Sequence, residues 1–232
     1  MDVNAIVAEV EKRILYEFKD KELLKCALTH SSFANELKIN KWENYQRLEF
    51  LGDAVLELVS SEFLYEGNAV MSEGKMSKTR ASMVCEPALA YCARKISLGE
   101  MIFLGKGEEA GGGRQRNSIL SDVFEAIIGA IYLDGGLEAA KKFIHKFVLD
   151  DVEDNQLFVD SKSILQEKIQ ALSDTTLSYK LISESGPEHD KRFEVAIYIN
   201  DECMATAEGH SKKDAEQKAA YSTLKKLQAN EA

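Results

Sequence analysis

Proline, cysteine and tryptophan are scarce in this sequence, and no apolar run is long. Its 232 residues include two prolines, four cysteines and one tryptophan. The scarcity of proline and a hydrophobic share of 45% exclude a disordered chain and allow one large or two ordinary domains. No stretch approaches the roughly 20 apolar residues that span a bilayer. Met1 to Ile14 lacks the basic start and apolar run of a signal peptide. We therefore expect a cytoplasmic protein with no membrane partner.

The four cysteines show no pattern typical of a metal site or a redox pair. No two are spaced as Cys-x-x-Cys, and none lies near a histidine at the spacing of zinc ligands. We expect Cys26, Cys85, Cys92 and Cys203 to be reduced thiols in the core. The sequence also has no nucleophilic serine or cysteine arrangement, and we expect no small-molecule organic cofactor.

The net charge of −10 argues, taken alone, against binding a polyanion such as a nucleic acid. Neither part of the chain is basic overall, because the residues from Asp160 onward hold 10 basic and 13 acidic side chains. A nucleic-acid site in this protein therefore has to be a local patch.

Residues 3–149 show helical periodicity almost throughout, with apolar side chains three and four positions apart. Ile6, Val10 and Ile14 form one such row. The exception is the segment 105–113, whose five glycines predict a flexible loop that is a candidate to flank the active site. The first part of the chain is therefore predicted to be an all-α domain.

Beyond a polar, acidic stretch from Asp150 to Gln156 the pattern changes, which predicts a domain boundary. Alternating apolar residues indicate strands, and a helix flanks them on each side. The expected elements are a helix from Ser161 to about Leu172, strands near 177–182, 193–199 and 204–208, and a helix from Ser211. The sequence thus predicts domains at residues 1–155 and 160–229, the second a small α+β domain in the order α-β-β-β-α.

Acidic side chains interrupt a strongly apolar helix at residues 44–57. Glu49 and Asp53 are four apart, and Gln46 is three before Glu49, so all three line one helical face. Two adjacent carboxylates bordered by apolar side chains are costly unless a cation neutralises them, and a hard divalent ion is the obvious candidate. The apolar border consists of Leu48, Phe50, Leu51 and Val55.

A second acidic pair, Asp122 and Glu125, lies three apart in another apolar helix. Gly52 and Gly129 lie close to the two pairs, and their lack of side chains would let the two helices approach closely. The alternative is that all four acids belong to solvated helix faces, and spacing alone does not decide between the two interpretations.

The segment Arg47-Leu-Glu-Phe-Leu-Gly-Asp-Ala-Val-Leu56 closely resembles the signature of the bacterial ribonuclease III family. Residues 27–32, 73–81 and 121–126 resemble further segments of that family. The resemblance implies that Glu49, Asp53, Asp122 and Glu125 bind Mg²⁺, or Mn²⁺ in its place, with Asp53 and Glu125 most central to catalysis.

The resemblance also implies a secondary role at the cleavage site for Gln46 and Glu73. Many family members carry glutamate where this chain has Gln46, so one negative charge is missing at the rim of the cluster. A glutamine oxygen can still accept a hydrogen bond, and we expect activity to survive.

Residues 160–228 resemble the double-stranded RNA-binding domain of the same family. Ser163, Gln166 and Glu167 share one helical face that can hydrogen-bond ribose hydroxyls in the minor groove of A-form RNA. His189 lies in the loop between the first two strands, which would enter a second minor groove. Lys212, Lys213 and Lys218 lie near a helix start capped by Ser211, where free backbone N–H groups favour phosphate. Lys212 and Lys213 could instead be ordinary solvated residues at the start of a helix. The expected partner is double-stranded RNA.

The function implied is a magnesium-dependent endoribonuclease of double-stranded RNA that works as a homodimer, since a twofold dimer matches the symmetry of a duplex. Mg²⁺ would activate a water and stabilise the leaving 3′ oxygen. The products would carry 5′-phosphate and 3′-hydroxyl ends with short 3′ overhangs, and the substrates would be rRNA, mRNA and tRNA precursors. Two alternatives are an RNA-binding protein without cleavage and a helical interaction protein. Neither accounts for the retained carboxylates.

Overall fold

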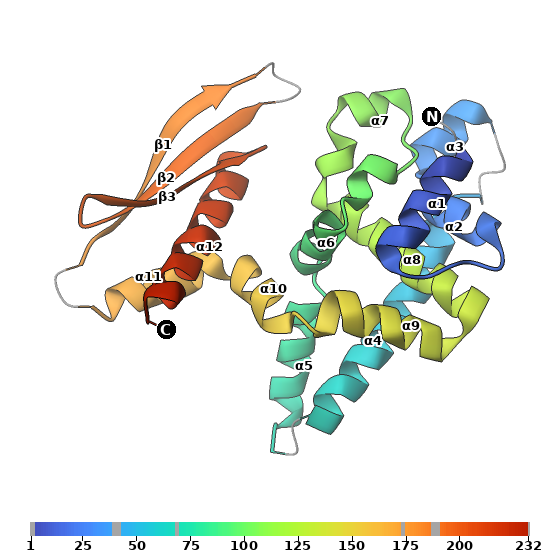
Figure 1. Cartoon of the computed structure of the whole chain (residues 1–232), viewed down its shortest axis with the longest axis horizontal. Helices are drawn as coiled ribbons and strands as arrows, with labels where there is room; N and C mark the ends of the chain where they lie inside the picture. Colours follow the sequence, from blue (N-terminus) through green and yellow to red (C-terminus); the bar gives the residue numbers. More distant parts are fainter. Residues whose placement is uncertain (1–2, 39–42, 68–69, 173–174, 187–190, 232) are drawn as a thin grey trace. The chain divides into compact units, whose positions relative to one another are not determined.

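The computed structural model describes residues 3–38, 43–67, 70–172, 175–186 and 191–231. The chain forms two compact units, Met1–Asn155 and Gln156–Ala232. The first is helical, and the second combines three strands with helices (Figure 1). The predicted fold class, an all-α domain followed by a small α+β domain, is confirmed.

Most helices of the first unit fall where the apolar periodicity predicts them. In chain order they are α1 Val3–Ile14, α2 Lys21–Ala27, α3 Ser31–Leu37, α4 Gln46–Gly67, α5 Glu73–Met83, α6 Glu86–Lys95, η1 Leu98–Met101, α7 Lys106–Ala110, η2 Gly113–Gln115, α8 Asn117–Gly135, α9 Leu137–Ile144 and the π-helical turn η3 His145–Leu149. Helix α10, Val152–Val159, begins in the first unit and ends in the second. Helix α8 lies at the centre of the unit, and its apolar row Phe124, Ile127, Ile128 and Ile131 is fully buried.

The glycine-rich segment 105–113 is not the continuous loop that the sequence predicts, because it contains helix α7. Side-chain contacts hold this helix in place. Glu108 forms an ion pair with Arg116, and Glu109 forms one with Arg114. Only Gly112 adopts a left-handed backbone conformation, with φ of 75°. Glycine content predicts only the local tendency of the backbone to form a loop. It does not predict the ion pairs with the arginines that follow the segment, so α7 was missed.

The acidic stretch at which the sequence predicts a domain boundary is helical, since α10 begins at Val152. Lys95 pairs with Asp151 at 2.8 Å, and the Tyr91 hydroxyl donates to Asp154 at 3.2 Å. These partners lie on α6, about 60 positions earlier in the chain. The start of this stretch is therefore attached to the first unit.

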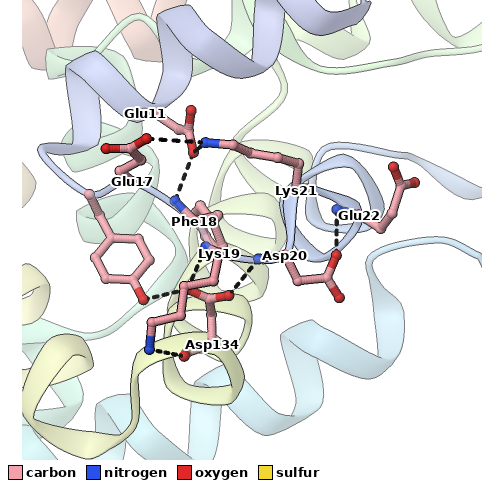
Figure 2. Close-up of polar contacts among 9 residues, drawn as sticks. Glu11, Glu17, Phe18, Lys19, Asp20, Lys21, Glu22 and Asp134 are labelled. Carbon is pink, nitrogen blue, oxygen red and sulfur yellow. Dashed lines mark hydrogen bonds and ion pairs between the residues drawn. The ribbon is translucent and has the colours of Figure 1, made fainter.

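Asp134, near the C-terminal end of α8, holds the connection between α1 and α2 (Figure 2). Its carboxylate accepts the Tyr16 hydroxyl at 2.7 Å and the backbone N–H groups of Lys19 and Asp20 at 3.1 and 2.9 Å. Asp20 in turn caps α2 by accepting the backbone N–H of Glu22. One side chain therefore fixes the path by which the chain enters α2.

The second unit has the predicted order α-β-β-β-α. Its elements are α11 Ser161–Gln170, β1 Leu177–Ser185, β2 Arg192–Ile199, β3 Glu202–Gly209 and α12 Lys212–Glu231. The strands form an antiparallel sheet in the order β1-β2-β3, with α11 and α12 packed on one face (Figure 1). Leu165 of α11, Ile197 of β2 and Leu224 of α12 meet in the core.

All four cysteines are free thiols, as predicted, but they are not all in the core. Cys92 is buried, Cys26 and Cys85 are half-buried, and Cys203 is exposed near the start of edge strand β3. No helix within the described ranges is both long enough and apolar enough to span a membrane.

Candidate functional site

Helices α4 and α8 touch backbone to backbone at two glycines. A β-carbon on Gly52 would lie 1.8 Å from the carbonyl oxygen of Glu125. One on Gly129 would lie 2.2 Å from the carbonyl oxygen of Leu48. Real β-carbons never approach other atoms so closely, so only glycine fits at either position. The prediction that these glycines allow close approach is confirmed, and the contact lies beside both acidic pairs.

The four predicted carboxylates gather across this contact, Glu49 and Asp53 from α4 and Asp122 and Glu125 from α8. Burial raises the pKa of Glu125 to about 8, with further contributions from the negative charges of Asp53, Glu49 and Asp122. Burial likewise raises the pKa of Glu49 to about 7, helped by repulsion from Asp122 and Asp53. Charges that shift one another in this way share one site.

Lysine and arginine do not balance this negative charge, because within the described ranges none of the four carboxylates forms an ion pair with either residue type. Asp122 accepts hydrogen bonds only from neutral groups, the hydroxyls of Tyr45 at 3.2 Å and Ser121 at 3.4 Å. Burial is the main cause that raises the pKa of Asp122. The cluster therefore has the electrostatic character of a cation-binding site.

The donor chemistry fits a hard divalent ion, because carboxylate oxygens are the ligands that Mg²⁺ and Mn²⁺ prefer. The fit is one of charge and donor type. In the part of the chain that the structure describes, no three acidic, histidine or cysteine side chains converge as a ready-made coordination shell. Some of these carboxylates would therefore have to reorient before three of them could share one ion.

The apolar border around the acids is less buried than the sequence argument assumes. Leu48 and Val55 are buried, but Phe50 is 80% exposed and Asp53 is exposed. The periodicity identifies α4 as apolar without showing which of its faces has a partner within the chain. The close contact of α4 with α8, rather than a surrounding apolar wall, removes water from Glu49 and Glu125.

The two secondary residues lie at different places. Gln46 is the first residue of α4, with an exposed side chain, and its backbone N–H donates to Asn44 at 3.1 Å. Glu73 is the first residue of α5 and accepts the Ser77 hydroxyl at 2.9 Å. Glu73 is not among the charges that shift the pKa values of Glu49, Asp122 and Glu125. Within one chain, Gln46 therefore adjoins the cluster by position on α4, whereas nothing links Glu73 to it.

The RNA-facing residues predicted on the first helix of the second unit share one exposed surface. Ser163, Gln166 and Glu167 are exposed on α11, while Leu165 and Ile169 of the same helix are buried. The polar face is therefore free to meet a ligand. His189 lies outside the described residues.

The start of α12 presents two free cations. Lys212 and Lys213 are exposed and form no ion pair with any described residue. The predicted cap is present, since Ser211 Oγ accepts the backbone N–H of Asp214 at 3.1 Å. Lys218, which the sequence also places in this patch, instead pairs with Asp214 at 2.8 Å. The local basic patch at this cap therefore consists of Lys212 and Lys213.

The raised pKa values predict how stability varies with pH when divalent ions are chelated. The folded chain holds protons on Glu49 and Glu125 more tightly than the unfolded chain, where glutamate titrates near 4.5. The resulting contribution to the free energy of unfolding is fully present below about pH 4.5 and is lost as the pH rises through about 8. We expect the melting temperature in EDTA to fall over this range, and to fall less steeply for Glu125→Gln. The exposed Glu138→Gln variant is the control and should keep the wild-type slope; equal slopes for all three proteins would contradict the assignment.

Comparison with known proteins adds to this geometry. Residues 20–152 match the family described as Ribonuclease-III-like, and residues 161–227 match the double-stranded RNA binding motif. The protein named Ribonuclease 3 from Caldanaerobacter subterraneus subsp. tengcongensis is 50% identical over 221 residues, which cover 94% of this chain and 96% of that protein.

Two solved structures are similar to the first unit. The nuclease domain of ribonuclease III from Campylobacter jejuni is 47% identical with a TM-score of 0.56, over 60% of this chain and 91% of that chain. A second structure of the same domain, concerned with flexibility in a region involved in dimer formation, has the same identity and TM-score over 61% of this chain and 97% of that chain.

Proposed function

This chain belongs to the ribonuclease III family, as its motifs predict, and on that premise we propose that it cuts double-stranded RNA with the help of Mg²⁺. The family membership makes it an endonuclease with a double-stranded RNA-binding domain. The observation that supports the metal requirement is the cluster of four carboxylates between α4 and α8, with which no lysine or arginine of the described residues forms an ion pair.

Glu49, Asp53, Asp122 and Glu125 would hold Mg²⁺, or Mn²⁺ in its place. A bound divalent ion supplies activation of a water molecule and stabilisation of the charge that develops on the leaving oxygen. The chain itself supplies the anchoring carboxylates, with Asp53 and Glu125 most central. Gln46 offers a neutral oxygen at the start of α4. From the family resemblance, Glu73 would lie near the cleavage site.

We further propose products with 5′-phosphate and 3′-hydroxyl ends, and cytoplasmic processing of rRNA, mRNA and tRNA precursors. These proposals rest on the family membership alone, since the geometry of the cluster does not distinguish one structured RNA from another. Recognition through ribose hydroxyls and phosphates predicts modest sequence preference.

The test is incubation of the purified chain with a long duplex RNA, its single strands, and a DNA duplex of the same sequence. Each substrate is incubated with Mg²⁺ and, separately, with EDTA. We expect cleavage of the RNA duplex with Mg²⁺ only, and little cleavage of the other substrates. Duplex binding without cleavage in Mg²⁺ would instead establish an RNA-binding protein that lacks nuclease activity.

Binding of the duplex should depend on the basic patch at the start of α12. Replacing Lys212 and Lys213 together with alanine removes two phosphate contacts, so duplex affinity should fall. The slope of log affinity against log salt should become shallower by about 2. A filter-binding titration at several salt concentrations measures both quantities.

Lys225 and Lys226 provide a matched control, because they are adjacent exposed lysines further along the same helix. Their double alanine variant makes the same change in charge and should keep the wild-type salt slope. Equal loss of slope in both double variants would mean that α12 contributes only general positive charge.

We also propose that the chain works as a homodimer through the exposed apolar face of α4. Phe50, Leu58 and Tyr65 are 80%, 55% and 76% exposed and lie within one side of that helix. Exposed apolar side chains in such a row indicate a protein interface. A related nuclease domain has a region involved in dimer formation, which supports the same state here.

Phe50→Glu should convert the dimer to monomers, because a charge buried within an apolar interface is left unpaired. Sedimentation velocity on wild type and variant at equal concentration measures this. Val70→Glu is the control, since Val70 is 99% exposed and lies outside α4. A monomeric wild type, or a dimeric Phe50→Glu variant, would contradict the proposal.

A further inference from the structure

Tyr45 is the residue immediately before α4, and its backbone connects two parts of the first unit. Its N–H donates to the carbonyl oxygen of Thr29 at 3.0 Å, and its own carbonyl oxygen accepts the N–H of Glu49 at 2.8 Å. The side chain is only 4% exposed, and its ring lies 5.6 Å from that of His30. The phenol therefore has a fixed position at the start of the helix that carries Glu49 and Asp53.

The hydroxyl of this buried ring is directed at the acidic cluster. It donates to Oδ2 of Asp122 at 3.2 Å, a bond between residues 77 positions apart. Burial and the negative charges of Asp122, Glu49 and Glu108 raise the pKa of Tyr45, so the phenol stays protonated at neutral pH. A neutral donor that faces several carboxylates can bind one of them without adding to their repulsion.

We propose that Tyr45 is a positioning residue that holds Asp122 in the orientation in which it contributes to a divalent-cation site. The inference rests on the proposed function, because it assigns a role toward the cation that the four acids would bind. A carboxylate among like charges gains by rotating toward solvent. The Tyr45 hydroxyl opposes that rotation by fixing Oδ2, while Ser121 contacts Oδ1 only at 3.4 Å.

Hydrogen-bond partners of metal-binding carboxylates commonly change metal affinity by about 10- to 100-fold when they are removed. Tyr45→Phe keeps the ring and removes only the donor. We therefore expect it to weaken Mn²⁺ binding, measured by calorimetry without RNA, by about tenfold or more. Cleavage should need a correspondingly higher Mg²⁺ concentration for half-maximal rate, and most of the maximal rate should return at saturating Mg²⁺.

The chain offers a closely matched control in Tyr16→Phe. Tyr16 also donates its hydroxyl to an aspartate of α8, Asp134, at 2.7 Å, but within the contact that holds the α1–α2 connection (Figure 2). Each variant removes the hydroxyl of a tyrosine that donates to an aspartate of α8. Tyr16→Phe should keep wild-type Mn²⁺ affinity even where it lowers the melting temperature.

The outcomes separate the two hypotheses. A wild type that neither binds Mn²⁺ nor cuts duplex RNA overturns the proposed function and the Tyr45 inference with it. A wild type that does both, with Mn²⁺ affinity equal in Tyr45→Phe and Tyr16→Phe, overturns the role of Tyr45 alone. The double variant Tyr45→Phe with Asp122→Asn adds a check against general damage, because it should bind Mn²⁺ no more weakly than Asp122→Asn alone; additive losses would mean that Tyr45 does not act through Asp122.

Discussion

Glu125→Gln is expected to abolish cleavage of duplex RNA while leaving duplex binding at the wild-type level. Glu125 is the most strongly perturbed acid of the cluster, because burial and four neighbouring carboxylates raise its pKa to about 8. Glutamine keeps its shape but removes the negative charge that a divalent ion requires. We expect the cleavage rate to fall by about a thousandfold or more, equivalent to about 4 kcal/mol in the activation barrier.

The measurement is single-turnover cleavage with enzyme in excess, together with duplex affinity in Ca²⁺ or EDTA. The residues predicted to contact RNA lie in the second unit, so affinity should not change. Glu138→Gln is the control, since Glu138 is an exposed acid at the start of α9 and is not among the charges that act on Glu125. Normal cleavage by Glu125→Gln would refute the assignment of the site.

Gly52→Ala is expected to destabilise the first unit far more than the same substitution at Gly74. The new β-carbon would lie 1.8 Å from the backbone oxygen of Glu125, and backbone atoms cannot move aside as a flexible side chain can. Helices α4 and α8 would have to separate through the middle of the core. We expect a loss of about 4 kcal/mol or more, a large part of the stability of an ordinary domain. Denaturant unfolding followed by circular dichroism measures it.

Gly74→Ala serves as the control for this substitution. Gly74 is also helical, in α5, but a β-carbon there meets no atom within 4 Å. Alanine is the better helix former, so this variant should be equal in stability to wild type or more stable by about 0.5–1 kcal/mol. If Gly52→Ala unfolds at the same denaturant concentration as Gly74→Ala, the backbone contact between α4 and α8 does not form in solution.

Much of this architecture can be predicted from the sequence, because periodicity and spacing carry it. The spacing of Glu49 and Asp53 places both on one helical face, and the neighbouring glycines predict the close contact with α8. The alternation of apolar residues after position 176 predicts the three strands. In each case the information lies within a few residues of the feature it predicts.

The features that the sequence did not predict depend on residues distant in the chain. The Tyr45 hydroxyl is notable only beside Asp122, 77 positions later. The sequence pattern predicts that Phe50 is part of the core, yet its side chain is 80% exposed. Helix α7 begins in a glycine-rich segment, where Glu36, 70 positions earlier, accepts the backbone N–H of Lys106. The spacing of the acids likewise predicts which carboxylates gather, but not the rotamers that would place them around one ion.

Calorimetric titration of Mn²⁺ into the chain without RNA tests the central claim most directly, with Glu49→Gln plus Asp122→Asn as the comparison. The account predicts saturable binding to the wild type, release of protons from Glu49 and Glu125 near neutral pH, and loss of both signals in the double variant. Binding that is absent from the wild type, or equally strong without these two carboxylates, would contradict it.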